Sequence, residues 1–562
     1  MSAAAIALPP RSNPARGQGD LLRHVPEDTA LYALVEQHLE GFLAYARERN
    51  GSALPKDVVQ EFREYLRCGV LAHGFLRARC DHCSQELFIA FSCKNRGICP
   101  SCTNRRMCAE AAHLVDRVLP DVPVRQWVIT VPYALRLALA ADARALTAVS
   151  RIAMDEVTRS YRRRASAVGL DDAETGSIAF HQRFGGSLNL HVHIHAVFID
   201  GAYASSTPSN DEGAAASTPS RPFAFHPLAA PSPHEIADVV QRIRDRVFKW
   251  AKRQRRALAR RFDAASADAD PIAQRVRIGA SRGHYATLAP DGRVRAAEPD
   301  DAAFSPRRSP AMSAAVDEFN LHAGVTVPAW DRDARERRLR YCARPPFSLA
   351  RLSVLSDGRV AYRTTYPGPH GHTHRVMDPL EFMARLAALV PPPRSPRVRY
   401  AGVRAPNSPH RGRVVPLNAA AGAVCEGITP QGDHRGPTPP GVAAATTASS
   451  SQGSGGSRAE AGWLREAPTG ATSGTPAPRG AAASGNLPPA PTPATRYVDW
   501  ASLLRRIHRL DALSCARCGG RLAVIAVLHE PAAIAKVLTH VGASPSRSPP
   551  RRIVEPWASD PP

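Results

Sequence analysis

The chain has 562 residues, of which 73 are Lys or Arg and 50 are Asp or Glu, giving a formal net charge of +23 and an isoelectric point near 10.2. Such an excess of cations is typical of proteins that bind a polyanion, because Lys and Arg displace condensed counterions from phosphates; a coding bias toward arginine would produce the same charge. No stretch approaches the roughly 20 uncharged apolar residues that a membrane span needs, and residues 1–20 lack the features of a secretory signal. We therefore expect a cytoplasmic, nucleoid-associated protein whose 11 cysteines are thiols or metal ligands rather than disulfides.

The first half of the chain predicts helices followed by a β-hairpin. Apolar residues return every three or four positions in residues 31–50 and again in residues 55–71, which predicts two helices. Trp127–Val131 predicts a strand, followed by a proline-led turn and helical sequence to about residue 165. Residues 176–201 predict two strands joined at a Gly-Gly turn.

The second half of the chain also predicts both helices and strands. Residues 233–262 predict a long helix with a very basic end, and residues 331–344 predict a short one that stops before Pro345, because proline lacks the N–H and clashes with the preceding turn. Residues 350–366 predict a hairpin that bends at Asp-Gly. Together these elements predict an α+β fold.

Composition and motifs divide the chain into segments. From about residue 417 to 494 the sequence consists mainly of Gly, Pro, Ser, Thr and Ala, which is typical of a disordered linker. We predict a flexible leader (1–28), a zinc-binding ribbon domain (29–112), a catalytic domain (113–405), the disordered linker (406–496), a small C-terminal module with a C-x2-C pair (497–545) and a tail (546–562).

Two cysteine pairs follow the first helices. Cys80/Cys83 and Cys99/Cys102 are both C-x2-C pairs, separated by fifteen residues, which is the spacing of a four-thiolate zinc site. The other cysteines of this region are expected not to bind the ion: Cys68, Cys93 and Cys108. Arginines and lysines surround the pairs, and a zinc ribbon so rich in cations usually contacts nucleic acid.

Another C-x2-C pair, Cys515/Cys518, lies near the end of the chain and is followed by two glycines. It is one knuckle without an evident second. It is half of a site completed by His508 or another chain, or it is a simple turn, and the sequence slightly favours the turn.

Three histidines alternate with apolar residues in the second strand of the first hairpin. Because side chains alternate faces along a strand, His191, His193 and His195 share one face. Neutral imidazoles bind divalent cations readily, and two rings two residues apart on a strand chelate one ion while leaving positions for a substrate oxygen. A polar, solvated strand face is the alternative.

Residues 189–195, Asn-Leu-His-Val-His-Ile-His, resemble the His-hydrophobic-His (HUH) motif of rolling-circle tyrosine transposases of the insertion-sequence ninety-one type. The segment Leu-Arg-Tyr-Cys-Ala-Arg-Pro-Pro at 339–346 and the Cys515/Cys518 region resemble the same family. The resemblance covers roughly residues 31–400 and 497–545. It implies an HUH-nuclease-like antiparallel sheet with helices, preceded by a helical zinc-ribbon domain.

The resemblance also implies a chemistry. In this family a Mg²⁺ or Mn²⁺ ion held by the two motif histidines, here His193 and His195, polarises a phosphate of single-stranded DNA, and a tyrosine attacks it to give a 5′-phosphotyrosine and a free 3′-OH. Tyr341 matches the family's first nucleophile. The position of the second is Pro345, so we expect a single nucleophile, with Tyr362 and Tyr366 as the next candidates.

Other site residues are less constrained by the sequence. HUH sites usually have a third polar ligand, and the candidates are His191, His181, Gln182 and Asp200. Arg344 and Arg351 flank the tyrosine and fit bidentate phosphate contacts, although a surface role is equally compatible. The basic helix end around Trp250, with Lys252 and Arg255, fits either a DNA track or a solvated face.

The predicted function is therefore DNA transposition by metal-assisted tyrosine chemistry. Two alternatives stay open. A plasmid replication initiator or relaxase uses the same chemistry on an origin, and only the genomic context separates it. A non-catalytic zinc-ribbon DNA-binding protein, left by a decayed element, would bind DNA without depending on Tyr341 or the two histidines.

Overall fold

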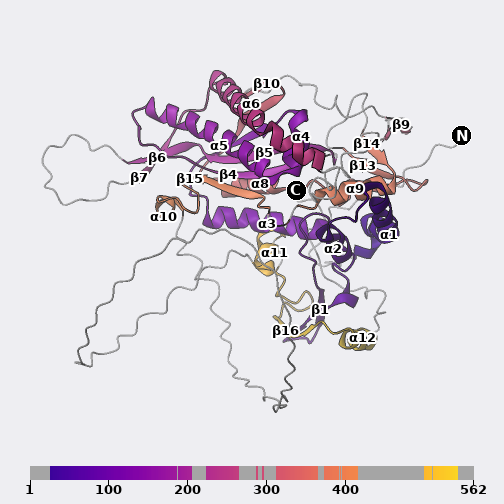
Figure 1. The fold of residues 1–562 in the computed structure, drawn as a ribbon. Helices are drawn as coiled ribbons and strands as arrows, with labels where there is room; N and C mark the ends of the chain where they lie inside the picture. Colours follow the sequence, from indigo (N-terminus) through magenta and orange to yellow (C-terminus); the bar gives the residue numbers. More distant parts are fainter. Residues whose placement is uncertain are drawn as a thin grey trace, which may run out of the picture. The chain divides into compact units, whose positions relative to one another are not determined.

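The computed structural model describes residues 26–186, 188–205, 223–264, 286–288, 294–296, 312–364, 373–391, 393, 395–415, 499–508 and 511–541. The predicted leader except its last three residues, most of the predicted linker and the predicted tail lie outside the described residues. The described residues form an α+β fold of helices and antiparallel sheets, as the sequence predicts (Figure 1).

The bounds of the elements follow the sequence patterns closely. The helices are α1 (Ala30–Asn50), α2 (Lys56–Tyr65), α3 (Pro100–Arg117), α4 (Tyr133–Ala141), α5 (Ala143–Ser166), α6 (Pro233–Ala264), α8 (Arg332–Ala343), α9 (Pro379–Leu389), α10 (Arg411–Val414), α11 (Trp500–His508) and α12 (Pro531–His540), with short 3-10 turns at Pro26–Asp28, Leu71–His73 and Leu349–Arg351. The strands are β1 (Phe75–Cys80), β2 (Glu86–Ala90), β3 (Val124–Thr130), β4 (Gly176–Phe184), β5 (Leu190–Ile199), β6 (Gly201–Ser205), β7 (Phe223–Pro227), β8 (Ala286–Leu288), β9 (Val294–Ala296), β10 (Ser313–Val316), β11 (Phe319–Val327), β12 (Leu352–Val354), β13 (Val360–Arg363), β14 (His374–Met377), β15 (Val398–Gly402) and β16 (Leu522–Leu528).

A six-stranded antiparallel sheet forms the centre of the predicted catalytic domain, in the order β10-β11-β3-β5-β4-β15. The predicted hairpin is confirmed as β4 and β5, and the predicted strand at Trp127–Val131 is confirmed as β3. The strand with the three histidines, β5, is therefore paired on both sides, which fixes which of its side chains share a face.

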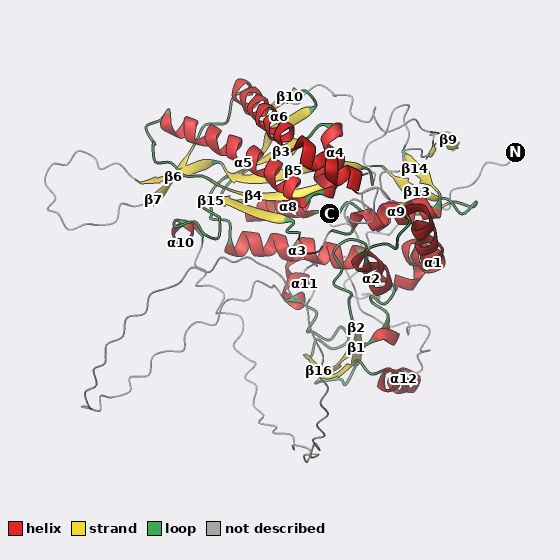
Figure 2. Cartoon of the chain, viewed as in Figure 1, coloured by secondary structure: helices red, strands yellow, loops and turns green. Residues whose placement is uncertain are grey.

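One face of this sheet packs on α4, α5 and α6, and the other on α3 and α8 (Figure 2). Val192, Ile194 and Ala196 of β5 are buried in a core with apolar residues of α5 and α6. On the other face, Ile178, Phe180 and Val197 pack against α3 and α8. The histidines of β5 point to this second face, because they alternate with the residues in the first core.

A smaller three-stranded sheet, in the order β16-β1-β2, joins the two ends of the described chain. β1 pairs with β2 from the N-terminal region and with β16 from the C-terminal module, both antiparallel. The ribbon predicted from residues 29–112 alone therefore includes a strand from residues 522–528.

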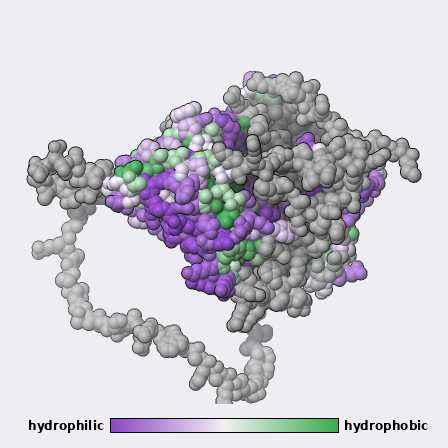
Figure 3. All heavy atoms as spheres, turned by 90° about the horizontal axis from the view of Figure 1, so that it is seen from above, coloured by the Kyte–Doolittle hydropathy of each residue, from purple (hydrophilic) through white to green (hydrophobic). Residues whose placement is uncertain are grey.

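The second predicted hairpin is confirmed as β12 and β13, which belong to a sheet in the order β12-β13-β14-β8-β9. β6 and β7 form a separate pair. Seen from above, the surface of the described residues is mostly hydrophilic, with smaller hydrophobic patches between (Figure 3). Within the described residues, no helix combines the length and the apolar character that crossing a bilayer requires.

Candidate active site and metal centres

The three histidines form a row along one face of β5. The rings of His191 and His193 are 4.8 Å apart and nearly parallel, at 29°, whereas those of His193 and His195 are 4.9 Å apart and at 74°. In the neighbouring strands, Thr130 and Gln182 are in register with His193. The row lies on an inner strand of the sheet, and its His195 contacts Tyr341 of α8.

The ring of His193 is oriented by a backbone carbonyl two residues earlier in the same strand. Its Nδ1 donates to the carbonyl oxygen of His191 over 2.8 Å. Because a carbonyl only accepts, this bond places the proton on Nδ1 and leaves the lone pair on Nε2. Burial lowers the pKa of His193, so the ring stays neutral and able to coordinate a cation.

His195 is held from the side by a glutamine. The amide nitrogen of Gln126 and Nδ1 of His195 lie 2.6 Å apart, and Arg338 donates to the Gln126 Oε1 over 3.1 Å. Burial, followed by repulsion from His193 and Arg338, lowers the pKa of His195 to about 3. The contact with Gln126 holds the Nδ1 side of the ring. Nε2 offers a lone pair to an ion only when the glutamine presents its oxygen to His195, so that Nδ1 keeps the proton.

Tyr341 lies against His195. The two rings are 5.5 Å apart at 83°, an edge-to-face arrangement, and the tyrosine is 47% exposed. It sits in the last turn of α8, and the following residues leave the helix because Arg344, which precedes Pro345, is held in an extended conformation with ψ of 135°. The guanidinium groups of Arg338 and Arg344 lie 5.5 and 5.7 Å from the centre of its ring.

Of the four candidates for a third ligand, the geometry favours Gln182. It is in register with His193 on the neighbouring strand, and its amide nitrogen donates to the Cys342 carbonyl over 2.7 Å, which leaves Oε1 for a cation. His191 stacks on His193, so the in-plane lone pairs of the two rings do not converge. Among the described residues, only cysteine groups bring three or more His, Cys, Asp or Glu ligand atoms within 4.8 Å.

The two other candidates are corrected by the structure. His181 points to the opposite face of the sheet, where its Nε2 lies 2.8 Å from the Ser150 hydroxyl of α5. Asp200 is buried in a two-bond ion pair with Arg125, at 2.8 and 2.7 Å, and accepts a hydrogen bond from Tyr161. Neither carboxylate nor ring is available to an ion on the histidine face.

The alternative nucleophiles are less accessible. Tyr362 is fully buried, and its hydroxyl accepts a hydrogen bond from the backbone N–H of Ser348 over 3.0 Å. Tyr366 lies outside the described residues.

The residues predicted to contact DNA do not lie together in the structure. Arg344 stands beside Tyr341, whereas Arg351 donates to the Gly186 carbonyl in the hairpin turn over 2.7 Å. Lys252 is exposed on α6, which covers the face opposite the histidines, and Trp250 of the same helix packs against the core there. The side chain of Arg255 lies outside the described residues.

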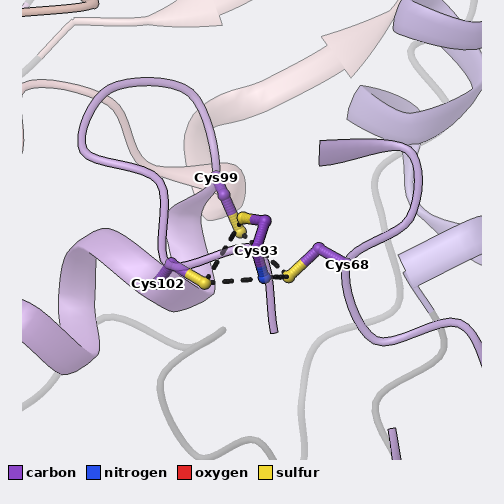
Figure 4. A group of neighbouring side chains, drawn as sticks. All are labelled: Cys68, Cys93, Cys99 and Cys102. Carbon is purple, nitrogen blue, oxygen red and sulfur yellow. Dashed lines mark hydrogen bonds between the residues drawn. The ribbon is translucent and has the colours of Figure 1, made fainter. Parts of the chain in front are cut away.

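The first cysteine group consists of Cys68, Cys93, Cys99 and Cys102 (Figure 4). Sulfur–sulfur distances within it are 3.7 Å (Cys68–Cys102), 3.6 Å (Cys68–Cys99) and 3.5 Å (Cys93–Cys102). A tetrahedral ion with zinc–sulfur bonds of about 2.3 Å requires sulfurs about 3.8 Å apart, so the group fits zinc closely. Hydrogen bonds from its neighbours, Cys68 first, lower the pKa of Cys102 well below its usual range.

The second group consists of Cys80, Cys83, Cys515 and Cys518. Here Cys80 and Cys518 are 3.5 Å apart and Cys83 and Cys515 are 3.6 Å apart. Gly520 allows the approach, because a Cβ there would lie 2.9 Å from the Cys80 sulfur. The C-terminal pair is thus half of a four-cysteine site rather than a simple turn.

The single site predicted from Cys80, Cys83, Cys99 and Cys102 is therefore wrong in its pairing. The structure separates the two C-x2-C pairs and completes each with other cysteines: Cys68 and Cys93 for one, and Cys515 and Cys518 for the other. The prediction failed because two knuckles close in sequence do not have to face each other once β16 enters the ribbon beside β1. Cys108 is buried and belongs to neither group.

The first cysteine group is connected to the helix of Tyr341 by α3. Cys99 and Cys102 lie at the start of this helix, which packs along α8 through Leu114, Val115 and Leu339. The C-terminal module reinforces the packing of α3 on α8. Arg506 of α11 donates to Asp116 of α3 and to Glu336 of α8, each over 2.6 Å.

Sequence reasoning missed several of these residues. Gln126 and Arg338 had no motif to mark them, because they reach His195 only through the register of β3 with β5 and the docking of α8. A signal did exist for the second cysteine group: Cys515/Cys518 repeats the C-x2-C spacing of Cys80/Cys83, and an unpaired knuckle requires a partner.

Two family models match the chain. Residues 34–131 match the model described as "Transposase zinc-binding domain" (Zn_Tnp_IS91), and residues 176–411 match the model described as "Putative transposase" (Y2_Tnp). Comparisons with curated proteins and with solved structures gave no match. The first model contains the first cysteine group, which supports a structural zinc ion, and the second contains the histidine strand and Tyr341. The chain therefore belongs to the transposases of the insertion-sequence ninety-one (IS91) type, which act on DNA.

Proposed function

We propose that this transposase nicks and rejoins single-stranded DNA through a covalent 5′-phosphotyrosine formed by Tyr341, as rolling-circle transposition requires. The observation that supports the proposal most directly is the contact between Tyr341 and His195. The ring centres of the exposed tyrosine and of the buried, neutral imidazole are 5.5 Å apart, and one nitrogen of the imidazole is in contact with Gln126. A hydroxyl beside two potential ligands of one cation is the arrangement that metal-assisted nucleophilic attack on a phosphate needs.

The step conserves the phosphodiester bond energy. The Tyr341 hydroxyl oxygen bonds to phosphorus as the bond from phosphorus to the 3′ oxygen breaks; the tyrosine proton passes to water, and the departing 3′ oxygen takes a proton from water. A Mg²⁺ or Mn²⁺ ion held by His193 and His195, with Gln182 Oε1 as third ligand, would supply Lewis acidity to a non-bridging phosphate oxygen. Arg338 and Arg344, whose guanidinium groups lie 5.5 and 5.7 Å from the centre of the Tyr341 ring, neutralise charge on the phosphate.

Covalent trapping tests the proposal. The full chain is incubated with labelled single-stranded DNA from both genomic ends of its element in Mn²⁺, and adducts that survive boiling in detergent are counted. We expect an adduct in the parent protein and none in Tyr341→Phe or in His193→Ala/His195→Ala. An adduct that persists in Tyr341→Phe would assign the attack to another residue.

The same assay separates the alternatives. DNA binding without any adduct in the parent protein would support a non-catalytic DNA-binding protein. An adduct formed on a plasmid origin but not on the element ends would support a replication initiator.

A further inference from the structure

A pocket lined by arginines opens beside the proposed nucleophile. Its cavity of about 70 Å³ has space for several water molecules, and hence for a phosphate group. We name it the arginine pocket after four of its lining residues: Arg96, Arg183, Arg344 and Arg397. No Asp or Glu lines it.

Carboxylates offset only part of the positive charge of the pocket. Arg96, Arg183 and Arg397 donate to backbone carbonyls, those of Ser395 (2.8 Å), Val390 (3.3 Å) and Ala343 (3.4 Å) respectively. Within the part of the chain that the structure describes, no carboxylate forms an ion pair with any of the four arginines. Several partly buried guanidinium groups without counter-charges are unfavourable unless an anion joins them.

The arginines also repel one another. Burial, followed by repulsion from Arg397 and Arg96, lowers the pKa of Arg183 to about 10. Burial, followed by repulsion from Arg96 and Arg106, lowers the pKa of Arg397 to about 10. The carboxylates of Glu61 and Glu110 offset only part of this repulsion at Arg397.

The pocket adjoins the candidate active site. Gln182, in register with His193, lines both, and Arg344 reaches from the pocket to the ring of Tyr341. A DNA strand whose scissile phosphate lies at Tyr341 would therefore bring a neighbouring phosphate of the same strand to the four arginines.

One wall of the pocket, Arg96 and Gly97, comes from the loop between two cysteines of the first group. Arg96 lies between Cys93 and Cys99, and the carboxylate of Glu61 accepts N–H bonds from Arg96 (3.1 Å) and Gly97 (3.0 Å) in this loop. The loop that holds Arg96 at the catalytic sheet is thus fixed at both ends by sulfur ligands and in its middle by Glu61.

We propose that the arginine pocket binds a backbone phosphodiester of single-stranded DNA next to the scissile one, and that the first cysteine group takes part in this binding by positioning Arg96. The inference rests on the proposed function for the identity of the strand. Binding is measured without cleavage, so failure of the chemistry and failure of the pocket are distinguishable.

The experiment uses the full chain with Tyr341→Phe and follows the anisotropy of a labelled oligothymidylate over a series of salt concentrations. Each phosphate contact contributes about 0.7 to the slope of log affinity against log salt for single strands. We expect Arg96→Gln and Arg397→Gln each to reduce this slope by about 0.7 and to weaken binding roughly tenfold or more at low salt. Arg163→Gln, the loss of an exposed charge on α5, is the matched control and should leave the slope unchanged.

Two further measurements guard against a folding defect. Arg344→Gln changes an exposed side chain and should reproduce the smaller slope with an unchanged melting temperature. An oligothymidylate with neutral methylphosphonate linkages should bind the parent and the pocket variants equally. If the pocket variants keep the slope of Arg163→Gln, or if Arg344→Gln alone does, the pocket does not bind the strand and the proposal is overturned.

Discussion

Tyr341 and His195 meet edge to face, with ring centres 5.5 Å apart, although one belongs to α8 and the other to β5. The contact exists because α8 packs on the histidine face of the sheet through Leu339 and Cys342, which lie in the same core as Phe180 and Val197. A potential nucleophile and a potential metal ligand are thereby held by packing on two separate elements rather than by a shared loop.

This arrangement predicts that replacing Tyr341 affects the covalent adduct, whereas replacing Tyr362 affects the free energy of unfolding. Tyr341→Phe should leave the free energy of unfolding within about 0.5 kcal/mol of the parent, because the side chain is half exposed, while abolishing the covalent adduct. Tyr362→Phe should keep the adduct and cost about 1 kcal/mol, because its buried hydroxyl accepts the Ser348 N–H. Urea unfolding and adduct trapping on the same preparations check both; the reverse pattern would assign the chemistry to Tyr362.

A second prediction concerns Gln126. An imidazole that coordinates through Nε2 must carry its proton on Nδ1, so with metal bound the Gln126 side chain must present an oxygen to His195. Gln126→Glu retains an acceptor for both His195 and Arg338, and we expect Mn²⁺ affinity equal to or above that of the parent. Gln126→Leu removes the orienting group and should weaken Mn²⁺ binding roughly 10–100-fold.

Calorimetric titration with Mn²⁺ measures these affinities, with the melting temperature as the check on folding. Equal affinity in the parent, Gln126→Leu and Gln126→Glu would mean that His195 does not coordinate the ion.

The local pattern of the chain was sufficient to predict its elements but not its long-range pairings. The alternation in β5, the proline stop after α8 and the Asp-Gly bend between β12 and β13 are all short-range signals, and each was confirmed. The phase of the histidines and the apolar residues in β5 also predicted which side chains enter the core.

What the sequence could not predict depends on tertiary contacts. C-x2-C spacing specifies a knuckle but not its partner. Which cysteines complete each group could be known only from the pairing of β1 with β16. The four arginines of the arginine pocket come from distant segments and share no motif. Asp200 was a reasonable ligand by composition, but its pairing with Arg125 follows from the packing of β3 beside β5.

A third prediction is that the chain binds two zinc ions, one in each cysteine group. Metal analysis of the parent should give two per chain, and Cys515→Ser/Cys518→Ser should give one, because the second group loses half of its ligands. The variant should still contain the zinc of the first group, which lies within the family's zinc-binding domain. Cys108→Ser is the control, since this buried thiol belongs to neither group and its loss should leave two ions. A parent protein with one zinc, unchanged in Cys515→Ser/Cys518→Ser, would contradict the second site.

The last prediction separates Asp200 from the metal ligands. Asp200 is 9% exposed, and its carboxylate pairs with Arg125, which is 5% exposed. Asp200→Ala leaves that guanidinium buried without a counter-charge, so we expect a loss of roughly 3–5 kcal/mol in the free energy of unfolding. The partly exposed pair of Arg162 with Glu174 provides the comparison, and Glu174→Gln should cost no more than about 1 kcal/mol.

Because Asp200 is engaged by Arg125 and Tyr161 away from the histidine row, the folded fraction of Asp200→Asn should bind Mn²⁺ with the affinity of the parent. Urea unfolding gives the first quantity and calorimetry at low temperature, where the variant is folded, gives the second. A side chain that only neutralises a buried arginine contributes to the free energy of unfolding and not to the affinity for the ion. If the Asp200 variants unfold like the parent but no longer bind Mn²⁺, Asp200 is therefore a metal ligand after all.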